Sequence, residues 1–451
     1  MPPDHRVAVI GGGITGLTAA WTLCTAPNPP HVTLLEAGPR LGGKLHTEQI
    51  DGVTIELGAD AFVGHAEPLE LLREVGLGDE LVAPDTREVW IRFGGRLHPL
   101  PAGLVLGVPT RLVPLTRSSL ISRGGTARAA LDLILPRQRD VDERSVAALI
   151  AHRFGREVLE RLVEPFLAGV YAGDVDQLEV AAATPDLAAA ARTGRSLMRA
   201  LGRARAASGG PTFRSVAGGL RRLVEALAGA PGLDVHIDSV VRRLEPSGDG
   251  YVLERPGGWD HADAAIVAVP APAAAALLRH AAPVAAAELD AIPYASVATI
   301  TLVYPPGSAR LVGSGVLVPR VEEGLVKAAT WVSQKWAGRV DDGRIVIRAS
   351  VGRHGDDAAL QLDDETLVLA VHRELHDLAG SAALPVAWRV TRWRTALPQY
   401  VIGHRNRVAR VRAATRQLPG VELAGAAYEG VGIAACVRQG RHAAARLLAR
   451  R

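Results

Sequence analysis

The chain has 451 residues, a length that allows two or three domains and a large hydrophobic core. With 48% hydrophobic residues it is a globular sequence, and its formal net charge of +4 is too small to indicate a nucleic-acid-binding protein. Its 2 cysteines, Cys24 and Cys436, both lie in apolar segments, which argues against a disulfide scaffold and against a cysteine metal site.

No segment has the pattern of a membrane span or of a secretion signal. The uncharged run Ala264–Leu278 is too short to span a bilayer and contains prolines. No positively charged secretory segment precedes the first apolar run. We therefore expect a cytoplasmic protein.

The N-terminal stretch has the pattern of a dinucleotide-binding turn. Val7–Ile10 is a short apolar run, typical of a strand that is buried on both faces. Gly11, Gly13 and Gly16 follow with G-x-G-x-x-G spacing, and Leu17–Leu23 is typical of a helix. In such a unit the first glycine allows the tight turn, the second lets the backbone approach a pyrophosphate, and the third lets the helix pack on the strand. The free N–H groups at the helix start favour phosphate.

A second apolar strand, Val32–Leu35, ends at Glu36, which lies 20 residues after Gly16. An acidic side chain at this point can accept hydrogen bonds from both hydroxyls of the adenosine ribose. A βαβ unit without a ligand is the alternative, and it is weaker because every part of the binding unit is in place. We expect nucleotide contacts from the turn and its neighbours: Gly11, Gly12, Gly13, Ile14, Thr15, Gly16, Glu36 and Ala37.

The next residues indicate FAD rather than NAD. Arg40, Gly42, Gly43 and Lys44 complete an E-x3-R-x-G-G-[RK] pattern, which adds a second glycine turn and a cation beside the pyrophosphate. The pattern resembles the flavin-dependent amine oxidase and protoporphyrinogen oxidase superfamily, and the resemblance implies FAD as cofactor. The same segment also fits the front of a P-loop, but Leu45 stands where a P-loop needs Ser or Thr for magnesium.

The segment 51–61 has the pattern of a strand that ends in a small-residue turn. In the resembled superfamily a Gly-Ala pair at this point passes close to the flavin ring. The resemblance implies that role for Gly58, Ala59, Asp60 and Ala61, whereas the residues alone indicate a plain turn.

Between about 90 and 210 the chain changes to a Pro-, Gly- and Arg-rich texture with several helical patterns. Arg144–Leu162 has apolar residues at helical spacing. We expect a helical insertion whose apolar face packs against the other domains; a peripheral membrane contact is the alternative.

Inside this insertion, the string PFLAGVYAGD (165–174) predicts a helix end followed by a glycine-bounded loop with one aromatic residue. It resembles the PF-x-x-GVYAGD motif of bacterial protoporphyrinogen and coproporphyrinogen oxidases. The resemblance implies a catalytic role for Gly169, with its carbonyl beside the porphyrinogen. It also implies substrate contacts from Gly169, Val170 and Tyr171.

The segment 211–289 contains strand patterns that we expect to return to the nucleotide domain, and the resemblance implies that the backbone of Val241 meets the adenine. The segment 290–395 repeats strand-like runs at the spacing of an antiparallel sheet, crossed by a helix at Glu365–Leu378. His372 and His376 lie one turn apart on that helix, but no third ligand is evident, so we expect no metal site.

Two lysines of this region are left open. Flavin amine oxidases often hold a lysine near flavin N5 through a water molecule, and Lys327 or Lys335 could take that place. No motif secures either position.

The C-terminal part contains two more strings of the resembled family. RWRTALPQY (392–400) resembles an RW-x-x-A-x-PQY segment in which the tryptophan, here Trp393, borders the flavin; plain core is the alternative. LAGAAYEGVGI (423–433) leads from a strand into a helix start, which suits the electron-rich end of a reduced flavin. The resemblance implies cofactor contacts from Gly425, Gly430, Val431, Gly432 and Ile433.

Together these patterns predict a protein of mixed α/β and α+β class. A Rossmann-like FAD-binding domain is assembled from the discontinuous segments 1–89, 211–289 and 396–451. The helical insertion, 90–210, and an antiparallel-sheet substrate-binding domain, 290–395, complete the chain.

The resemblance implies FAD- and oxygen-dependent six-electron oxidation of coproporphyrinogen III to coproporphyrin III in haem biosynthesis, with release of hydrogen peroxide. Protoporphyrinogen IX is the other candidate substrate. We expect a tetrapyrrole substrate, no nucleic-acid partner and no metal, while the oligomeric state and the propionate-binding arginines stay open. The rivals are a flavin amine oxidase or carotenoid desaturase on the same scaffold, and a carrier similar to the GDP-dissociation inhibitors.

Overall fold

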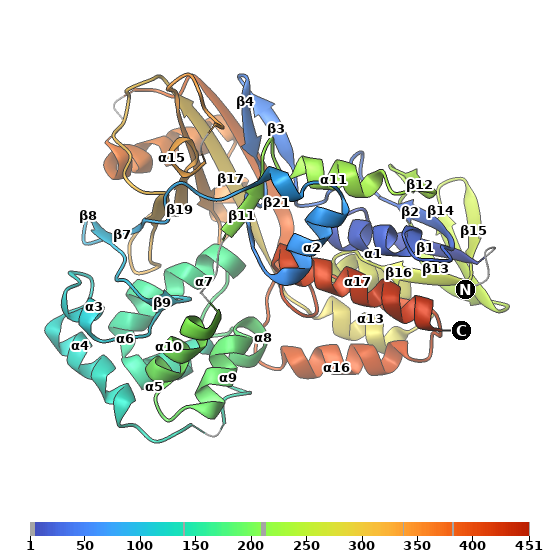
Figure 1. Cartoon of the computed structure of the whole chain (residues 1–451), viewed down its shortest axis with the longest axis horizontal. Helices are drawn as coiled ribbons and strands as arrows, with labels where there is room; N and C mark the ends of the chain where they lie inside the picture. Colours follow the sequence, from blue (N-terminus) through green and yellow to red (C-terminus); the bar gives the residue numbers. More distant parts are fainter. Residues whose placement is uncertain (1–4, 139, 209–212, 337, 381–382, 451) are drawn as a thin grey trace.

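The computed structural model describes residues 5–138, 140–208, 213–336, 338–380 and 383–450. Figure 1 shows an α/β body that holds both termini, a large sheet with one long helix on it, and a group of short helices. The nucleotide-binding pattern of the sequence lies in the α/β body, so the strands and helices of this body determine how its residues are placed.

The α/β body is built on a five-stranded parallel sheet with the order β12-β2-β1-β16-β22. Its strands come from three separate stretches of the chain, and the last of them lies close to the C-terminus. This arrangement confirms the Rossmann-like, discontinuous fold expected from the sequence. The strands are β1 (Arg6–Ile10), β2 (His31–Leu35), β12 (Leu233–His236), β16 (Ala264–Val267) and β22 (Val421–Leu423).

Alternate side chains of β1 show why this sheet is covered on both faces. Val7 and Val9 belong to a core shared with α1, α11 and α17, whereas Ala8 and Ile10 belong to a core on the opposite face. A strand that is buried on both faces has no side for polar residues, which explains the apolar run. The surrounding helices are α1 (Ile14–Cys24), α2 (Ala66–Glu74), α11 (Arg221–Ala228), α12 (Ala271–Leu278), α13 (Pro283–Asp290), α16 (His404–Thr415) and α17 (Ile433–Ala449).

The second body is a seven-stranded sheet in the order β21-β17-β20-β19-β18-β7-β8, antiparallel except between β18 and β7. The helix α15 (Asp364–Ala379) covers one face, where Leu367, Val371 and Leu375 pack on the strands. The hairpin β7–β8 forms one edge, although the sequence pattern placed most of it in the helical insertion. The strands are β7 (Val89–Phe93), β8 (Arg96–Pro99), β17 (Tyr294–Tyr304), β18 (Gly315–Leu317), β19 (Val326–Trp331), β20 (Ile345–Val351) and β21 (Ala387–Pro398).

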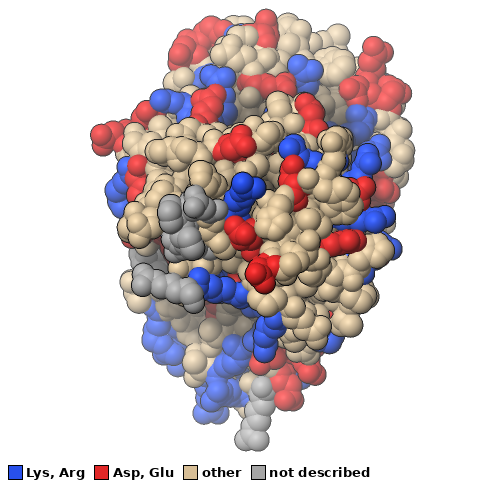
Figure 2. All heavy atoms as spheres, turned by 90° about the vertical axis from the view of Figure 1, so that its right-hand side faces the viewer, with Lys and Arg blue, Asp and Glu red and all other residues tan. Residues whose placement is uncertain are grey.

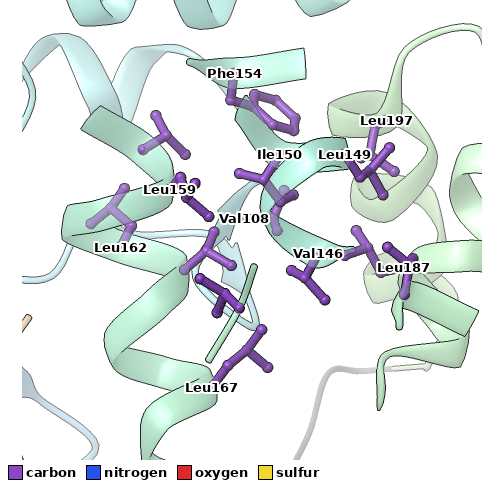
Figure 3. Close-up of a cluster of buried hydrophobic side chains, with 14 of the residues drawn as sticks. Val108, Val146, Leu149, Ile150, Phe154, Leu159, Leu162, Leu167, Leu187 and Leu197 are labelled. Atoms are coloured by element: carbon purple, nitrogen blue, oxygen red, sulfur yellow. The ribbon is translucent and has the colours of Figure 1, made fainter. Parts of the chain in front are cut away.

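The third body consists of short helices around one apolar core, in which Leu149, Ile150 and Phe154 are fully buried (Figure 3). The helical pattern of Arg144–Leu162 is divided between several helical segments. The helix α5 ends before Gly155, whose φ of +89° is left-handed, and the chain continues through α6 and a π-helical turn into α7. The helices are α3 (Val113–Thr116), α4 (Arg123–Ala130), η2 (Leu131–Leu133), α5 (Val146–Phe154), α6 (Arg156–Val158), η3 (Leu159–Val163), α7 (Glu164–Tyr171), α8 (Val180–Ala183), α9 (Pro185–Thr193) and α10 (Leu197–Ser208).

Several small elements connect the three bodies. The pattern SVAGGLRRLVEALA (215–228) predicts a helix with a small-residue cap at Ser215, but the strand β11 occupies that position and the helix α11 begins at Arg221. The small elements are β3 (Thr47–Ile50), β4 (Val53–Glu56), β5 (Phe62–Val63), η1 (Gly78–Glu80), β6 (Leu81–Val82), β9 (Leu104–Val105), β10 (Val108–Pro109), β11 (Phe213–Val216), β13 (Arg243–Ser247), β14 (Gly250–Arg255), β15 (Gly258–Ala262), α14 (Val332–Lys335) and η4 (Ala358–Gln361).

The boundary expected between residues 210 and 211 lies outside the described residues. For the rest of the chain we propose the domain division expected from the sequence, with the hairpin Val89–Pro99 assigned to the large sheet. In the part of the chain that the structure describes, no helix is both long and apolar enough to cross a bilayer.

Candidate flavin and substrate site

The first glycine turn joins β1 to α1 and leaves almost no room for side chains. Gly11 has a φ of +109°, and a Cβ on Gly16 would lie 1.9 Å from the carbonyl oxygen of Gly11. These two positions require glycine. At Gly13, by contrast, a Cβ would meet nothing within 4 Å. The backbone of Gly13 is therefore the open part of the turn, where a phosphate can approach the start of α1.

Two backbone amides fix the Glu36 carboxylate beside this turn. Its Oε2 accepts a hydrogen bond from the N–H of Gly12 at 2.7 Å, and its Oε1 accepts one from the N–H of Gly38 at 2.8 Å. Each oxygen retains a lone pair for a ribose hydroxyl. The loop after β12 closes on the same corner, because the N–H of Ser239 donates to the carbonyl of Glu36 at 2.8 Å. Val241 follows in that loop with a buried side chain.

The second glycine turn is joined directly to the first. The N–H of Gly42 donates to the carbonyl of Gly12 at 2.8 Å. The Arg40 guanidinium donates to the carbonyl of Gly43 at 2.8 Å and to that of Leu41 at 3.1 Å. Arg40 therefore holds the shape of the turn through its carbonyls.

The N-terminal and C-terminal turns meet through α1 and α17. A Cβ on Gly440 of α17 would lie 2.4 Å from the carbonyl oxygen of Thr15 in α1. One turn earlier in α17, burial raises the pKa of the Cys436 thiol, while a hydrogen bond to Thr15 and the charge of Lys44 lower it. Solvent reaches the side chain of Lys44, yet the protein around it desolvates the ammonium and lowers its pKa. This combination fits a side chain at the wall of a recess.

The start of α17 is open in the same way as the start of α1. Gly432 is the residue before the helix, and a Cβ on Gly432 or on Gly425 would meet nothing within 4 Å. Two side chains outside the turn accept hydrogen bonds from its backbone. Oε1 of Gln439 accepts one from the N–H of Gly425 at 3.3 Å, and the Tyr400 hydroxyl accepts one from the N–H of Gly430 at 2.7 Å. The sequence patterns did not single out either side chain, although Tyr400 ends the PQY string.

Gly58 brings a third backbone segment to the same place. A Cβ on Gly58 would lie 2.0 Å from the carbonyl oxygen of Lys44, which accepts a hydrogen bond from the N–H of Ala59 at 3.2 Å. The ring of Trp393 lies against Gly58, and its Nε1–H donates to the carbonyl of Leu57 at 3.2 Å. The structure thus brings together Gly58, Ala59, Trp393 and the second glycine turn.

Asp60 is held by cations that come from the large sheet and its adjoining helix α14. The Nζ of Lys335 lies 2.8 Å from one carboxylate oxygen, and Arg348 lies 3.3 Å from the other. Burial favours the protonated acid, but Lys335 and Arg348 outweigh it and hold the pKa of Asp60 well below its usual range. Arg348 also donates to the carbonyl of Gly58 at 2.9 Å. Of the two lysines left open by the sequence, Lys335 is the one beside the Gly58 segment.

Lys327 lies in β19 and has a different environment. Its Nζ donates to the carbonyl of Gly352 at 2.7 Å, and burial, with a smaller contribution from Arg353, lowers its pKa to about 7. On α15, Nδ1 of His372 contacts the hydroxyl of Tyr304 at 3.0 Å. Among the residues that the structure describes, no three His, Cys, Asp or Glu side chains are arranged to hold a metal.

The helix α7 exposes part of the GVY string. Gly169 is exposed, and a Cβ there would meet nothing within 4 Å; Val170 is exposed as well. Tyr171 differs, because its ring is buried in the helical core and its hydroxyl donates to the carbonyl of Ala183 at 3.0 Å. The carbonyl of Tyr171 accepts a hydrogen bond from Nε2 of Gln399 at 2.8 Å.

The first turn of α7 is fastened to the loops beside the large sheet. Oε1 of the buried Glu164 lies 2.6 Å from the Arg353 guanidinium, and Oε2 accepts from the N–H of Arg320 at 2.9 Å. Through these contacts α7 lies where the helical body meets β18 and β19. The first turn of α7, five residues before Gly169, is therefore placed at the junction of the two bodies.

These features fit an extended dinucleotide. The Glu36 carboxylate offers acceptors for a ribose, Gly13 offers open backbone at the start of α1, and Gly425 and Gly432 offer the same at the start of α17. Cβ atoms at the open glycines would fill the space that such a ligand needs.

Comparison with known proteins agrees with this geometry. Residues 14–448 match the family of flavin containing amine oxidoreductases, which confirms the flavin cofactor predicted from the sequence. The chain is 35% identical to the coproporphyrinogen III oxidase of Bacillus subtilis, with 97% of each chain covered. It is 39% identical to the coproporphyrinogen III oxidase of Mycobacterium bovis, with 95% of this chain and 94% of the relative covered.

A solved structure shows the same similarity to porphyrinogen oxidases. The crystal structure of a candidate protoporphyrinogen oxidase from Exiguobacterium sp. 255-15 superimposes with a TM-score of 0.88 at 33% identity, covering 98% of both chains. The chain therefore belongs to the flavin-containing amine oxidoreductase family and, within it, to the group that contains the bacterial coproporphyrinogen III oxidases.

Proposed function

We propose that the protein catalyses the FAD-dependent oxidation of coproporphyrinogen III to coproporphyrin III. The overall change removes six electrons and six protons from a non-aromatic tetrapyrrole. The observation that carries the proposal is the meeting of both glycine turns in a chain that is similar over its full length to proteins named for this reaction. Because a flavin takes two electrons at a time, the site must act three times on one substrate.

The contacts expected from the sequence divide into three groups along the cofactor. The residues Gly11–Gly16, Glu36 and Ala37, and Val241 would hold the adenosine and pyrophosphate half. The second turn, Arg40–Lys44, would continue along the pyrophosphate. The residues Gly58–Ala61, Trp393, Gly425 and Gly430–Ile433 would surround the isoalloxazine, with the start of α17 toward its electron-rich end.

When bound, FAD supplies an acceptor for the hydride that leaves a carbon between two pyrroles. The chain contributes position and a polar backbone rather than a strong base. The Gly169 carbonyl would stabilise positive charge that develops on the pyrroles, and Val170 would contact the flat face of the macrocycle. Because Tyr171 is buried, we assign its ring to the support of α7 and retain only its backbone at the substrate face.

We propose molecular oxygen as the final electron acceptor. Three molecules of oxygen would take up the six electrons and six protons as three molecules of hydrogen peroxide, which balances the reaction without a further co-reactant. Measuring peroxide release per porphyrin formed tests this stoichiometry directly.

The substrate choice is tested by offering coproporphyrinogen III and protoporphyrinogen IX separately and following porphyrin fluorescence. We expect faster formation of coproporphyrin III. Equal rates with both substrates would contradict the preference, and no fluorescence with either would contradict porphyrinogen oxidation. If no fluorescence appears, the flavin absorption of the same sample shows whether the protein is an inactive flavoprotein or a carrier that binds no flavin.

A further inference from the structure

We propose that Tyr400 is a positioning residue that sets the C-terminal glycine turn against the flavin. The inference rests on the proposed function and deepens it, because it assigns the geometry of the turn to a side chain outside the turn. Three sets of contacts carry it: the bonds of the hydroxyl, the packing of the ring, and the link to α7.

The Tyr400 hydroxyl bridges the two ends of the turn. It accepts a hydrogen bond from the N–H of Gly430 at 2.7 Å and donates one to the carbonyl of Ala426 at 2.6 Å. The side chain is fully buried, so no solvent competes for these bonds. Gly430 has a φ of +103°, a conformation with little intrinsic preference that depends on such outside support. One phenol thus fixes the entrance to α17.

The ring of Tyr400 is fixed by stacking as well. His404 stacks on Tyr400 with 4.0 Å between ring centroids and 14° between the planes. Burial lowers the pKa of His404 to about 4, which keeps the stacked imidazole neutral near pH 7. Burial also raises the pKa of Tyr400 well above its ordinary value, so the hydroxyl keeps the proton that it donates to Ala426.

The same segment holds the substrate side. The carbonyl of Tyr400 accepts a hydrogen bond from the N–H of Glu179 at 2.7 Å, and the rings of Tyr171 and Tyr400 are 5.6 Å apart. The neighbouring Gln399 donates to the carbonyl of Tyr171 at the end of α7. Residues 399–400 therefore hold the C-terminal turn and the end of α7 together, which fixes the spacing between the proposed flavin and substrate faces.

The direct test replaces Tyr400 by phenylalanine, which removes the hydroxyl and leaves two buried backbone groups unpaired. We expect the dissociation constant of FAD to rise about tenfold and the flavin absorption bands to shift. Tyr251→Phe is the matched control, since it removes the hydroxyl of a buried tyrosine that also donates to a backbone carbonyl, that of Pro419 at 2.8 Å, but belongs to the hairpin strand β14. It should leave FAD affinity and spectrum unchanged. Wild-type affinity and spectrum in Tyr400→Phe would overturn the proposal.

A second measurement does not depend on the folding of that variant. Replacing all 6 tyrosines by 3-fluorotyrosine gives one fluorine signal for each residue, and phenylalanine variants of the other five assign the signal of Tyr400. We expect this signal to shift when FAD is added, whereas the signal of Tyr251, which lies in the hairpin strand β14 and donates to the carbonyl of Pro419, stays in place. An unmoved Tyr400 signal contradicts the inference. Tight FAD binding without porphyrinogen turnover would instead contradict the proposed function alone.

Discussion

The carbonyl oxygen of Thr15 in α1 lies so close to Gly440 in α17 that a Cβ on this glycine would come within 2.4 Å of it. The first and last helices of the chain are therefore in backbone contact. This contact brings the glycine turn of β1 next to the glycine turn that precedes α17, although more than 400 residues separate them. The proposed flavin site depends on this contact.

Gly440→Ala should separate α1 from α17. We expect the free energy of unfolding to fall by about 2 kcal/mol, because the added methyl overpacks a backbone contact, and FAD retention to fall with it. Chemical denaturation and flavin content measure the two effects. Gly124→Ala in α4 is the matched control, since its Cβ would meet nothing closer than 3.7 Å. A Gly440→Ala protein with the stability and flavin content of the wild type would contradict a close contact between α1 and α17 at this glycine.

Glu36→Ala should weaken FAD binding about tenfold or more, because the carboxylate that would accept the ribose hydroxyls is lost. Titration of flavin-free protein with FAD measures the affinity. Glu225→Ala on the exposed side of α11 serves as control and should bind FAD normally. If both variants bind equally well, the adenosine half lies elsewhere.

Asp60→Asn should lower the free energy of unfolding at pH 7 by about 3 kcal/mol, since Lys335 and Arg348 lose their counter-charge. The pKa of Asp60 in the folded state lies below its ordinary value of 3.8. Its stabilising contribution is therefore present above pH 4 and declines as the pH falls further. Denaturation of both proteins at pH 7 and pH 3 should show a smaller difference at pH 3; a difference that grows on acidification would disprove the assignment.

Lys327→Met should remove a pH dependence on the alkaline side. The pKa of Lys327 is lowered from 10.5 to about 7, so the folded protein loses this proton before the unfolded chain does. Stability of the wild type should consequently rise by about 1.4 kcal/mol per pH unit between pH 7 and 10 from this group. The wild-type curve minus the Lys327→Met curve isolates that slope. A flat difference would place the ammonium in an ordinary, solvated environment.

Local motifs predicted the parts of the site that a short segment determines. The first glycine turn could be read from spacing because Gly16 is required by its contact with Gly11, and Gly11 by its own positive φ, both within one βαβ unit. The break at Gly155 interrupts the apolar spacing of Arg144–Leu162, and a glycine inside a helical pattern is the visible signal for it.

Contacts between distant segments could not be predicted in this way. The hairpin β7–β8 pairs with β18, some 220 residues later, and no local pattern encodes that partner. The same holds for Tyr400, because its hydroxyl bonds Ala426 and Gly430 in a turn whose position depends on the whole α/β body. Asp60 was predicted as a cofactor contact, but its cations, Lys335 and Arg348, come from another domain.

The most direct test of the account is hydrogen exchange of the backbone amides with and without FAD. We predict that FAD slows exchange in residues 11–16 and 425–433 together, at the same FAD concentration, while the hairpin β14–β15 is unaffected. Protection of only one of the two glycine turns, or of neither, would contradict the claim that both ends of the chain hold one flavin.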